Sequence, residues 1–260
     1  MAAKRSTREK IIIRNCRMSQ DQKWDWATSP KGDRRIARLI GSGSGANDMS
    51  WRRLMIQVIS VERTFRNQLT RSVGDLTMVL VGPRRDPGIG LQITTNFDVG
   101  YRYKNDVAHH LQNFLQSAVS LRNHVAKILD MRLNNLPQRD EAVTDMLGSA
   151  YQAYARNGRT ALVYSLGNVF RHELIPDTIV LTTNYSAPST PNPRFEVVTS
   201  LAMDGLIGGD GWNASSEAYA KLHNPVDLLD LANRYRHDTG LLVDLVVQEV
   251  RKEFSRMSQR

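Results

Sequence analysis

The stretch HHLQNFLQSAVSLRNHVAKIL, residues 109–129, contains the clearest helical pattern in the sequence. Its apolar side chains recur every three or four residues, a spacing that places them on one face of an α-helix. The pattern extends in both directions and predicts a helix from about Asp106 to about Met131. Because an amphipathic helix of this kind needs other elements to cover its apolar face, the stretch predicts a mainly α-helical fold.

Further helices are predicted on both sides of this one, separated by glycine, proline and asparagine residues that begin or end helices. Their approximate ranges are 50–73, 141–156, 160–174, 215–223 and 225–255. Helices dominate from residue 106 onward, so we expect an antiparallel helical bundle in that part of the chain.

Two segments rich in aliphatic and β-branched residues are predicted as β-hairpins inserted between the helices. The first pairs residues 76–82 with 89–99 across the loop PRRDPG. The second pairs residues 177–185 with 194–203 across the proline-rich loop SAPSTPNP. The predicted fold class is therefore mainly α, with β-hairpins inserted into a helical bundle.

The composition changes at GSGSGAND, residues 41–48, which is typical of a flexible linker. We expect a basic N-terminal extension and linker over residues 1–48. A helix with the first hairpin follows over 49–105, and the helical bundle occupies 106–260.

The positive charge of the protein is concentrated near its N-terminus. Residues 1–53 contain 13 Lys and Arg against 5 Asp and Glu, a net charge of +8, whereas the whole chain carries +9. Such a segment favours polyanions because each neutralised phosphate releases counterions. Arg34, Arg35 and Arg38 are the candidate nucleic-acid contacts in it. A solvated basic tail that aids solubility is the alternative interpretation.

Several classes of protein are excluded or left without support by the sequence. No apolar run approaches the 18 residues of a membrane span, and the single Cys16 excludes a disulfide framework. A phosphate-binding P-loop, a dinucleotide-binding glycine motif and a zinc-protease motif do not occur. We therefore expect a cytoplasmic protein without a membrane partner, a metal site or a cofactor.

The stretch SLGNVFRHELIP, residues 165–176, carries the most distinctive chemistry. Asn168 and His172 are four residues apart and share a face of the predicted helix, with Arg171 beside His172. An imidazole can act as a general acid or base near neutral pH, and a guanidinium can stabilise a phosphate. Metal-independent RNA cleavage needs both groups. The alternative is that His172 only interacts favourably with the C-terminal end of its helix.

The order of the helices, together with LGNVFRHELIP and GWNASSEAYAKL, resembles the HEPN superfamily of helical-bundle proteins over about residues 106–258. Leu166, Asn168, His172 and Pro176 match the pattern of bacterial HEPN-like proteins. The resemblance implies an RNA-binding protein that acts as a metal-independent endoribonuclease in a stress, toxin–antitoxin or phage-defence system. It also implies a homodimer.

The ribonuclease motif of that superfamily has an arginine, then a polar residue, then a histidine, and Gly167 occupies the arginine position here. In a catalytic protein, His172 would be the acid or base, Arg171 the phosphate contact and Asn168 the orienting group. Arg122 or His124 would complete the site if they faced this helix; a solvated helix face is the alternative for both. The second hypothesis is an inactive scaffold that mediates dimerisation or binds a protein partner.

Overall fold

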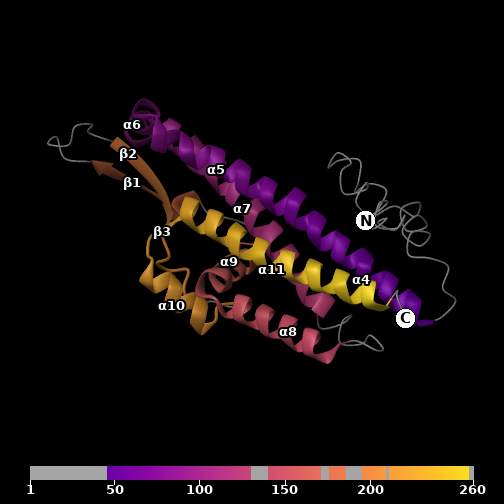
Figure 1. The fold of residues 1–260 in the computed structure, drawn as a ribbon. Coiled ribbons are helices and arrows are strands. Elements are labelled where there is room, and N and C mark those ends of the chain that lie inside the picture. Colours follow the sequence, from indigo (N-terminus) through magenta and orange to yellow (C-terminus); the bar gives the residue numbers. More distant parts are fainter. Residues whose placement is uncertain (1–45, 130–139, 171–175, 186–194, 209–210, 258–260) are drawn as a thin grey trace. The chain divides into compact units, whose positions relative to one another are not determined.

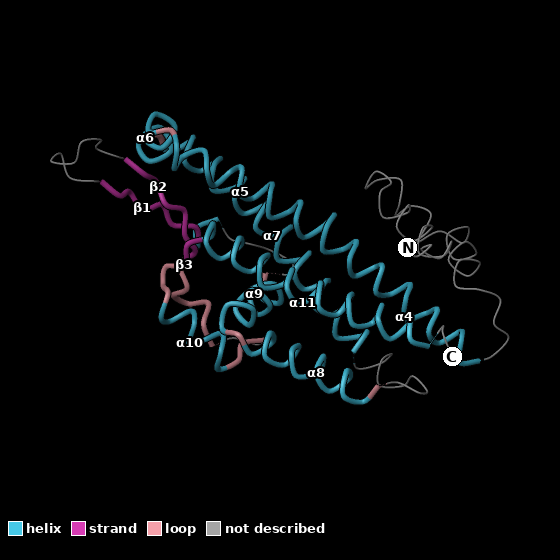
Figure 2. The backbone as a smooth tube through the Cα atoms, in the orientation of Figure 1, coloured by secondary structure: helices cyan, strands magenta, loops and turns pink. Residues whose placement is uncertain are grey.

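The structure is a computed structural model that describes residues 46–129, 140–170, 176–185, 195–208 and 211–257. Helices account for most of these residues (Figure 2), which confirms the mainly α prediction. The helices are α4 (Ala46–Arg63), the π-helix η1 (Thr64–Leu69), α5 (Thr70–Arg85), α6 (Pro87–Thr95), α7 (Phe97–Lys127), α8 (Glu141–Arg156), α9 (Gly158–Val169), the 3-10 helix η4 (Pro176–Thr178), α10 (Ala214–Leu222) and α11 (Leu228–Met257). Within these ranges, no helix combines the length and apolar content that crossing a membrane requires.

A small antiparallel sheet accompanies the helices (Figure 1). β1 (Ile179–Tyr185) pairs with β2 (Phe195–Leu201), in a register that runs from Ile179–Leu201 to Tyr185–Phe195. This pairing confirms the second predicted hairpin. The short strand β3 (Val226–Asp227) extends the sheet by pairing with the end of β2 and was not predicted.

The first predicted hairpin is wrong, because its residues lie in α5, α6 and the start of α7, which are separated only by Asp86 and Asn96. Leu76 and Leu80 are buried four residues apart, as on one face of a helix. The proline-containing loop separates two helices instead of two strands. The Asp86 carboxylate accepts hydrogen bonds from the backbone N–H groups of Gly88 (2.8 Å) and Ile89 (3.3 Å), and Pro87 occupies the first turn of α6.

The described chain divides into two compact units. The first takes its residues from the ranges up to 63, 124–147 and 244–260, and the second consists of 64–123 and 148–243. The boundary predicted between residues 105 and 106 falls inside α7, so these units do not follow it. The predicted N-terminal extension, residues 1–48, lies almost entirely outside the described residues.

Ion pairs join the helical segments of the first unit. Arg251 Nη2 lies 2.7 Å from Glu62 Oε2, and Arg256 contacts both Asp140 (3.1 Å) and Glu253 (2.8 Å). Glu253 is only 6 % exposed, so its pairing with Arg256 compensates for a buried charge. The apolar core of this unit consists of Leu54, Val58, Val61, Val125, Ile128, Leu129, Leu147, Val246, Val247 and Val250.

The second unit contains the residues from which a functional site can be built. Arg84 of α5 connects its helices to the sheet, since its guanidinium contacts Glu196 of β2 (3.2 Å) and Asp227 of β3. The hydroxyl of Tyr103 on α7 lies 2.7 Å from Thr199 Oγ1 on β2. These buried or half-buried polar contacts determine how α5, α7 and the sheet pack against each other.

Candidate functional site

The described part of the predicted motif lies on α9 and its C-terminal end, and the start of this helix is defined by a side chain. Asn157 Oδ1 accepts hydrogen bonds from the backbone N–H groups of Arg159 (3.1 Å) and Thr160 (3.4 Å). The structure describes the motif through Phe170. Arg171 and His172 lie outside the described residues, so their predicted catalytic roles stay predictions. Asn168 lies in the last turn of α9 and is half-buried.

Gly167 has a packing role. A Cβ atom at this position would lie 2.4 Å from Val119 Cγ2 and 3.3 Å from the backbone oxygen of Leu115. Both of these residues belong to α7, so α9 approaches α7 too closely for a side chain at position 167. Position 167 therefore cannot hold a side chain unless Val119 or the adjoining backbone shifts.

Ser165 fixes α9 against α10, and the two helices lie side by side (Figure 1). Its buried hydroxyl lies 2.9 Å from the backbone oxygen of Gly211 and 3.1 Å from Ser216 Oγ. Gly211 has a φ of +94°, a conformation that favours glycine. Asn213 and Ser216 form a capping box at the start of α10. Ser165 therefore has a structural role in packing α9 against α10.

Arg122 of α7 faces α9, the helix on which the predicted motif begins. Its guanidinium carbon lies 3.7 Å from the centroid of the Tyr164 ring on α9, a cation–π contact. The Nη1 atom is buried and has no hydrogen-bond partner among the described residues. In the same part of the chain, no carboxylate forms an ion pair with Arg122. Arg122 is therefore a half-buried cation with an unused donor.

The His124 side chain points to a different side of α7 from the Arg122 side chain, and the two differ in charge at neutral pH. Residues two apart on a helix point to different sides, so the two side chains do not share a face. Burial lowers the pKa of His124 below its ordinary value, and the charge of Lys127 lowers it further. The imidazole is therefore mostly neutral at neutral pH, which weakens it as a phosphate contact.

Arg34, Arg35 and Arg38 lie outside the described residues, so their role as nucleic-acid contacts stays a prediction. Among the described residues, no group of His, Cys, Asp and Glu side chains could hold a metal ion.

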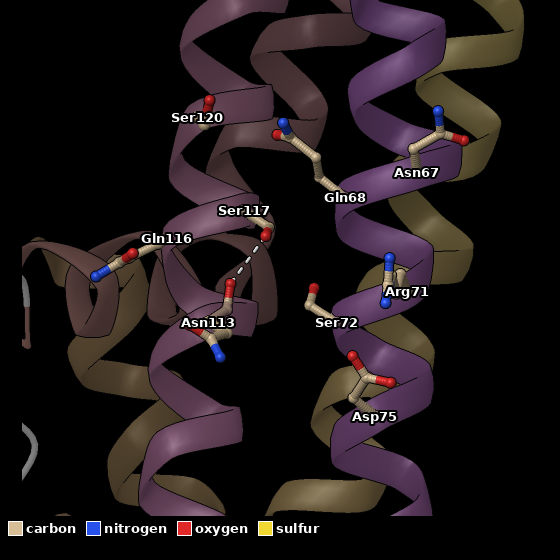
Figure 3. A pocket seen from close by; sticks show the side chains of 9 residues that line it. All are labelled: Asn67, Gln68, Arg71, Ser72, Asp75, Asn113, Gln116, Ser117 and Ser120. Atoms are coloured by element: carbon tan, nitrogen blue, oxygen red, sulfur yellow. Dashed lines mark hydrogen bonds between the residues drawn. The ribbon is translucent and has the colours of Figure 1, made fainter. Parts of the chain in front are cut away.

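A polar groove that sequence reasoning missed lies between η1 with α5 on one side and α7 on the other (Figure 3). Its volume is about 530 Å³. All of its lining residues are polar: Asn67, Gln68, Arg71, Ser72, Asp75, Asn113, Gln116, Ser117 and Ser120. Polar residues spaced three or four apart on two helices were the available signal, but only the structure shows that the two helical faces adjoin.

A buried hydroxyl network lies behind Arg122 in the second unit. Tyr154 Oη lies 2.9 Å from Thr239 Oγ1, and the Tyr235 hydroxyl donates to the backbone oxygen of Ala118 at 3.5 Å. Burial raises the pKa of Tyr154, and it raises the pKa of Tyr235 well above the ordinary value. These phenols stay protonated in the folded protein at pH values where unfolded tyrosine ionises.

The raised pKa values predict that the protein loses stability in alkali. Unfolded tyrosine ionises near pH 10 while folded Tyr235 stays neutral, so the stabilisation is complete below pH 10 and decreases as pH rises above it. The expected loss is up to about 1.4 kcal/mol per pH unit for each such tyrosine. Urea unfolding from pH 8 to 11 measures it. Tyr235→Phe should have a shallower decline, and an equal decline in both proteins would contradict the prediction.

Comparison of the chain with protein-family models, with curated proteins and with solved structures found no match. The functional interpretation therefore depends on the residues themselves.

Proposed function

We propose that the protein binds RNA and that the half-buried Arg122 is one of its phosphate contacts. A guanidinium offers five N–H donors, and phosphate is a preferred bidentate partner for it. The single observation that supports this assignment is that Arg122 has a buried, unpartnered Nη1 while its face rests on Tyr164. The cation–π contact holds the guanidinium in place without neutralising it, which leaves its charge for an anion.

The charge of the chain and the resemblance to HEPN-like proteins support RNA as the anion. The net charge is +9, most of it from the N-terminal segment, so a polyanion is attracted to the protein as a whole. We propose that the helical bundle is HEPN-like and that the protein acts as a homodimer in a stress or defence setting.

The phosphate contact predicts a specific change in RNA binding. Arg122→Met keeps an unbranched stem against Tyr164 but removes the charge, so the affinity for single-stranded RNA should fall about tenfold. The dependence of log K on log salt concentration should also become shallower by about one. Fluorescence anisotropy with labelled RNA in EDTA measures both quantities.

A matched control is Arg234→Met on α11, because Arg234 is exposed and already paired with Asp230 at 2.6 Å. That variant should bind RNA as the wild type does. Unchanged affinity and salt dependence in Arg122→Met would reject Arg122 as a phosphate contact, and no RNA binding by the wild type would reject the function itself.

The second candidate is a ribonuclease in which His172 acts as acid or base, with Arg171 and Asn168 beside it. The packing of Gly167 against α7 favours binding without cleavage, because the superfamily's arginine is missing for a structural reason. Incubation of labelled RNA with wild-type protein and His172→Ala in EDTA distinguishes the two. Cleavage by the wild type alone would support the nuclease; no cleavage, or equal cleavage by both, would support binding only.

A further inference from the structure

The groove of Figure 3 has an unusual lining for the space between two neighbouring helices. Two carboxamides come from each wall: Asn67 and Gln68 from η1, and Asn113 and Gln116 from α7. A carboxamide presents a donor beside an acceptor, the arrangement that pairs in a bidentate manner with the edge of adenine. These groups are of the type that recognises a base edge, and Figure 3 shows Gln68 extending toward the space between the helices and Gln116 extending away from it.

The two charged residues of the groove add the other types of base-recognising side chain. Arg71 and Asp75 are one helical turn apart on α5, and both are exposed. Neither forms an ion pair, with the other or with any residue the structure describes. Guanidinium pairs with the O6 and N7 atoms of guanine, and carboxylate accepts from the amino group of cytosine.

The π-helix η1 shapes one wall of the groove. π-helical turns are rare and occur frequently at functional sites. This one is held from behind: the Phe65 ring packs on Gly240 of α11, where a Cβ would lie 3.0 Å from Phe65 Cζ. Thr70 Oγ1 also donates to the backbone oxygen of Phe65 at 3.0 Å. From this π-helix, Gln68 extends toward the space between the two walls (Figure 3).

The lining also argues against other ligands. No apolar residue lines the groove, so it suits a polar ligand better than a lipid chain or the apolar face of a peptide. The charges of Arg71 and Asp75 cancel, so the groove does not attract a phosphate backbone by itself. Two hydroxyls are used internally, since Ser72 donates to Leu69 O (3.0 Å) and Ser117 to Asn113 O (2.8 Å). The Asn113 carboxamide is partly used as well, because its Nδ2 atom lies 3.2 Å from His109 Nε2. The remaining donors and acceptors form a neutral set.

We propose that this groove recognises the unpaired bases of a single-stranded RNA segment by hydrogen bonds to their edges. The inference rests on the proposed function, because it assumes that RNA is bound. Sequence-selective recognition of RNA takes place on single strands, whose base edges are accessible. The groove residues Asn113 and Ser117 and the α9-facing residues Leu115, Val119 and Arg122 occupy different faces of α7. Base recognition and the phosphate contact are therefore separable by mutation.

The experiment compares the affinities of the full chain for four labelled homopolymers of equal length, rA, rC, rG and rU, by anisotropy at several salt concentrations. The affinities of the wild type for the four homopolymers should span at least about tenfold, since each bidentate base contact discriminates between bases by roughly that factor. The double variant Asn67→Ala/Asn113→Ala should reduce the difference in affinity between the homopolymers about tenfold and keep the salt dependence of binding. Arg122→Met should keep that difference and reduce the salt dependence.

The matched control is Gln152→Ala/Gln248→Ala, which removes two exposed carboxamides outside the groove. It should rank the homopolymers as the wild type does, and circular dichroism should show that both double variants are folded. RNA binding without any ranking, or a ranking that survives Asn67→Ala/Asn113→Ala, would overturn the groove proposal alone. Absence of RNA binding by the wild type would overturn it together with the proposed function.

Discussion

Gly167→Arg is expected to lower the free energy of unfolding by about 3–5 kcal/mol and to leave the protein without nuclease activity. The substitution tests the proposed resemblance to HEPN proteins, under which an arginine at this position should give nuclease activity. The structure predicts otherwise, because the first side-chain atom would already lie 2.4 Å from Val119 Cγ2 and 3.3 Å from Leu115 O. The rest of the side chain would bring a charge into a buried helix contact.

A double-mutant cycle measures the contact without introducing a charge. Gly167→Ala gains about 1 kcal/mol of helix propensity but loses about 1–3 kcal/mol to the clash with Val119. In Val119→Ala the Cγ2 atom is gone, so Gly167→Ala should be less destabilising in that background by at least about 0.5 kcal/mol. Urea unfolding gives all four free energies. Additive effects, or a stable and RNA-cleaving Gly167→Arg protein, would show that α9 and α7 do not meet at this glycine.

The sequence predicts α8 to the residue because both ends of that helix are determined locally. Asp140 precedes it, and its carboxylate accepts from the backbone N–H groups of Ala142 (3.0 Å) and Val143 (3.4 Å). Asn157 follows it and caps the next helix. Since these capping residues lie within a few positions of the helix ends, no information from distant parts of the chain is needed.

The hairpin predicted over residues 76–99 fails because its decisive contacts are distant in sequence. A short aliphatic run beside proline and glycine suits a strand or a buried helix equally well. Gly90 of α6 lies against β2, where a Cβ would be 2.9 Å from Val197 Cγ2 and 3.0 Å from Phe195 Cε1. This packing between α6 and the sheet, across more than one hundred residues, favours the helix.

The candidate sites also combine features that the sequence reveals with features that depend on contacts between distant segments. The sequence singled out Gly167 because it occupies the arginine position of the motif that this stretch resembles, and Arg122 because it would complete the site if it faced that helix. It could not show that Arg122 rests on Tyr164 or that Gly167 meets Val119, since those contacts depend on how α7 and α9 are aligned. The polar groove is formed by segments some forty residues apart, and each segment alone resembles an ordinary solvated helix face.

Tyr235→Ala is the second substitution with a large expected effect, a loss of about 3–5 kcal/mol in the free energy of unfolding at neutral pH. Tyr235 of α11 is 1 % exposed, and its ring packs edge-on against Phe114 of α7 at 5.7 Å between centroids. It also lies 6.4 Å from the Tyr154 ring of α8. Truncation would therefore leave a cavity where three helices of one compact unit meet.

The control variant separates the ring from its hydroxyl. Tyr235→Phe keeps the packing and removes the hydroxyl, with its 3.5 Å hydrogen bond to Ala118 O and its side-chain hydrogen bonds with Tyr154 and Thr239, so it should cost about 1–2 kcal/mol. Chemical denaturation followed by circular dichroism gives both free energies. A small loss in Tyr235→Ala would show that α7, α8 and α11 do not share a packed core at this point. Equal large losses in both variants would mean that the hydroxyl network, rather than the ring, holds the three helices together.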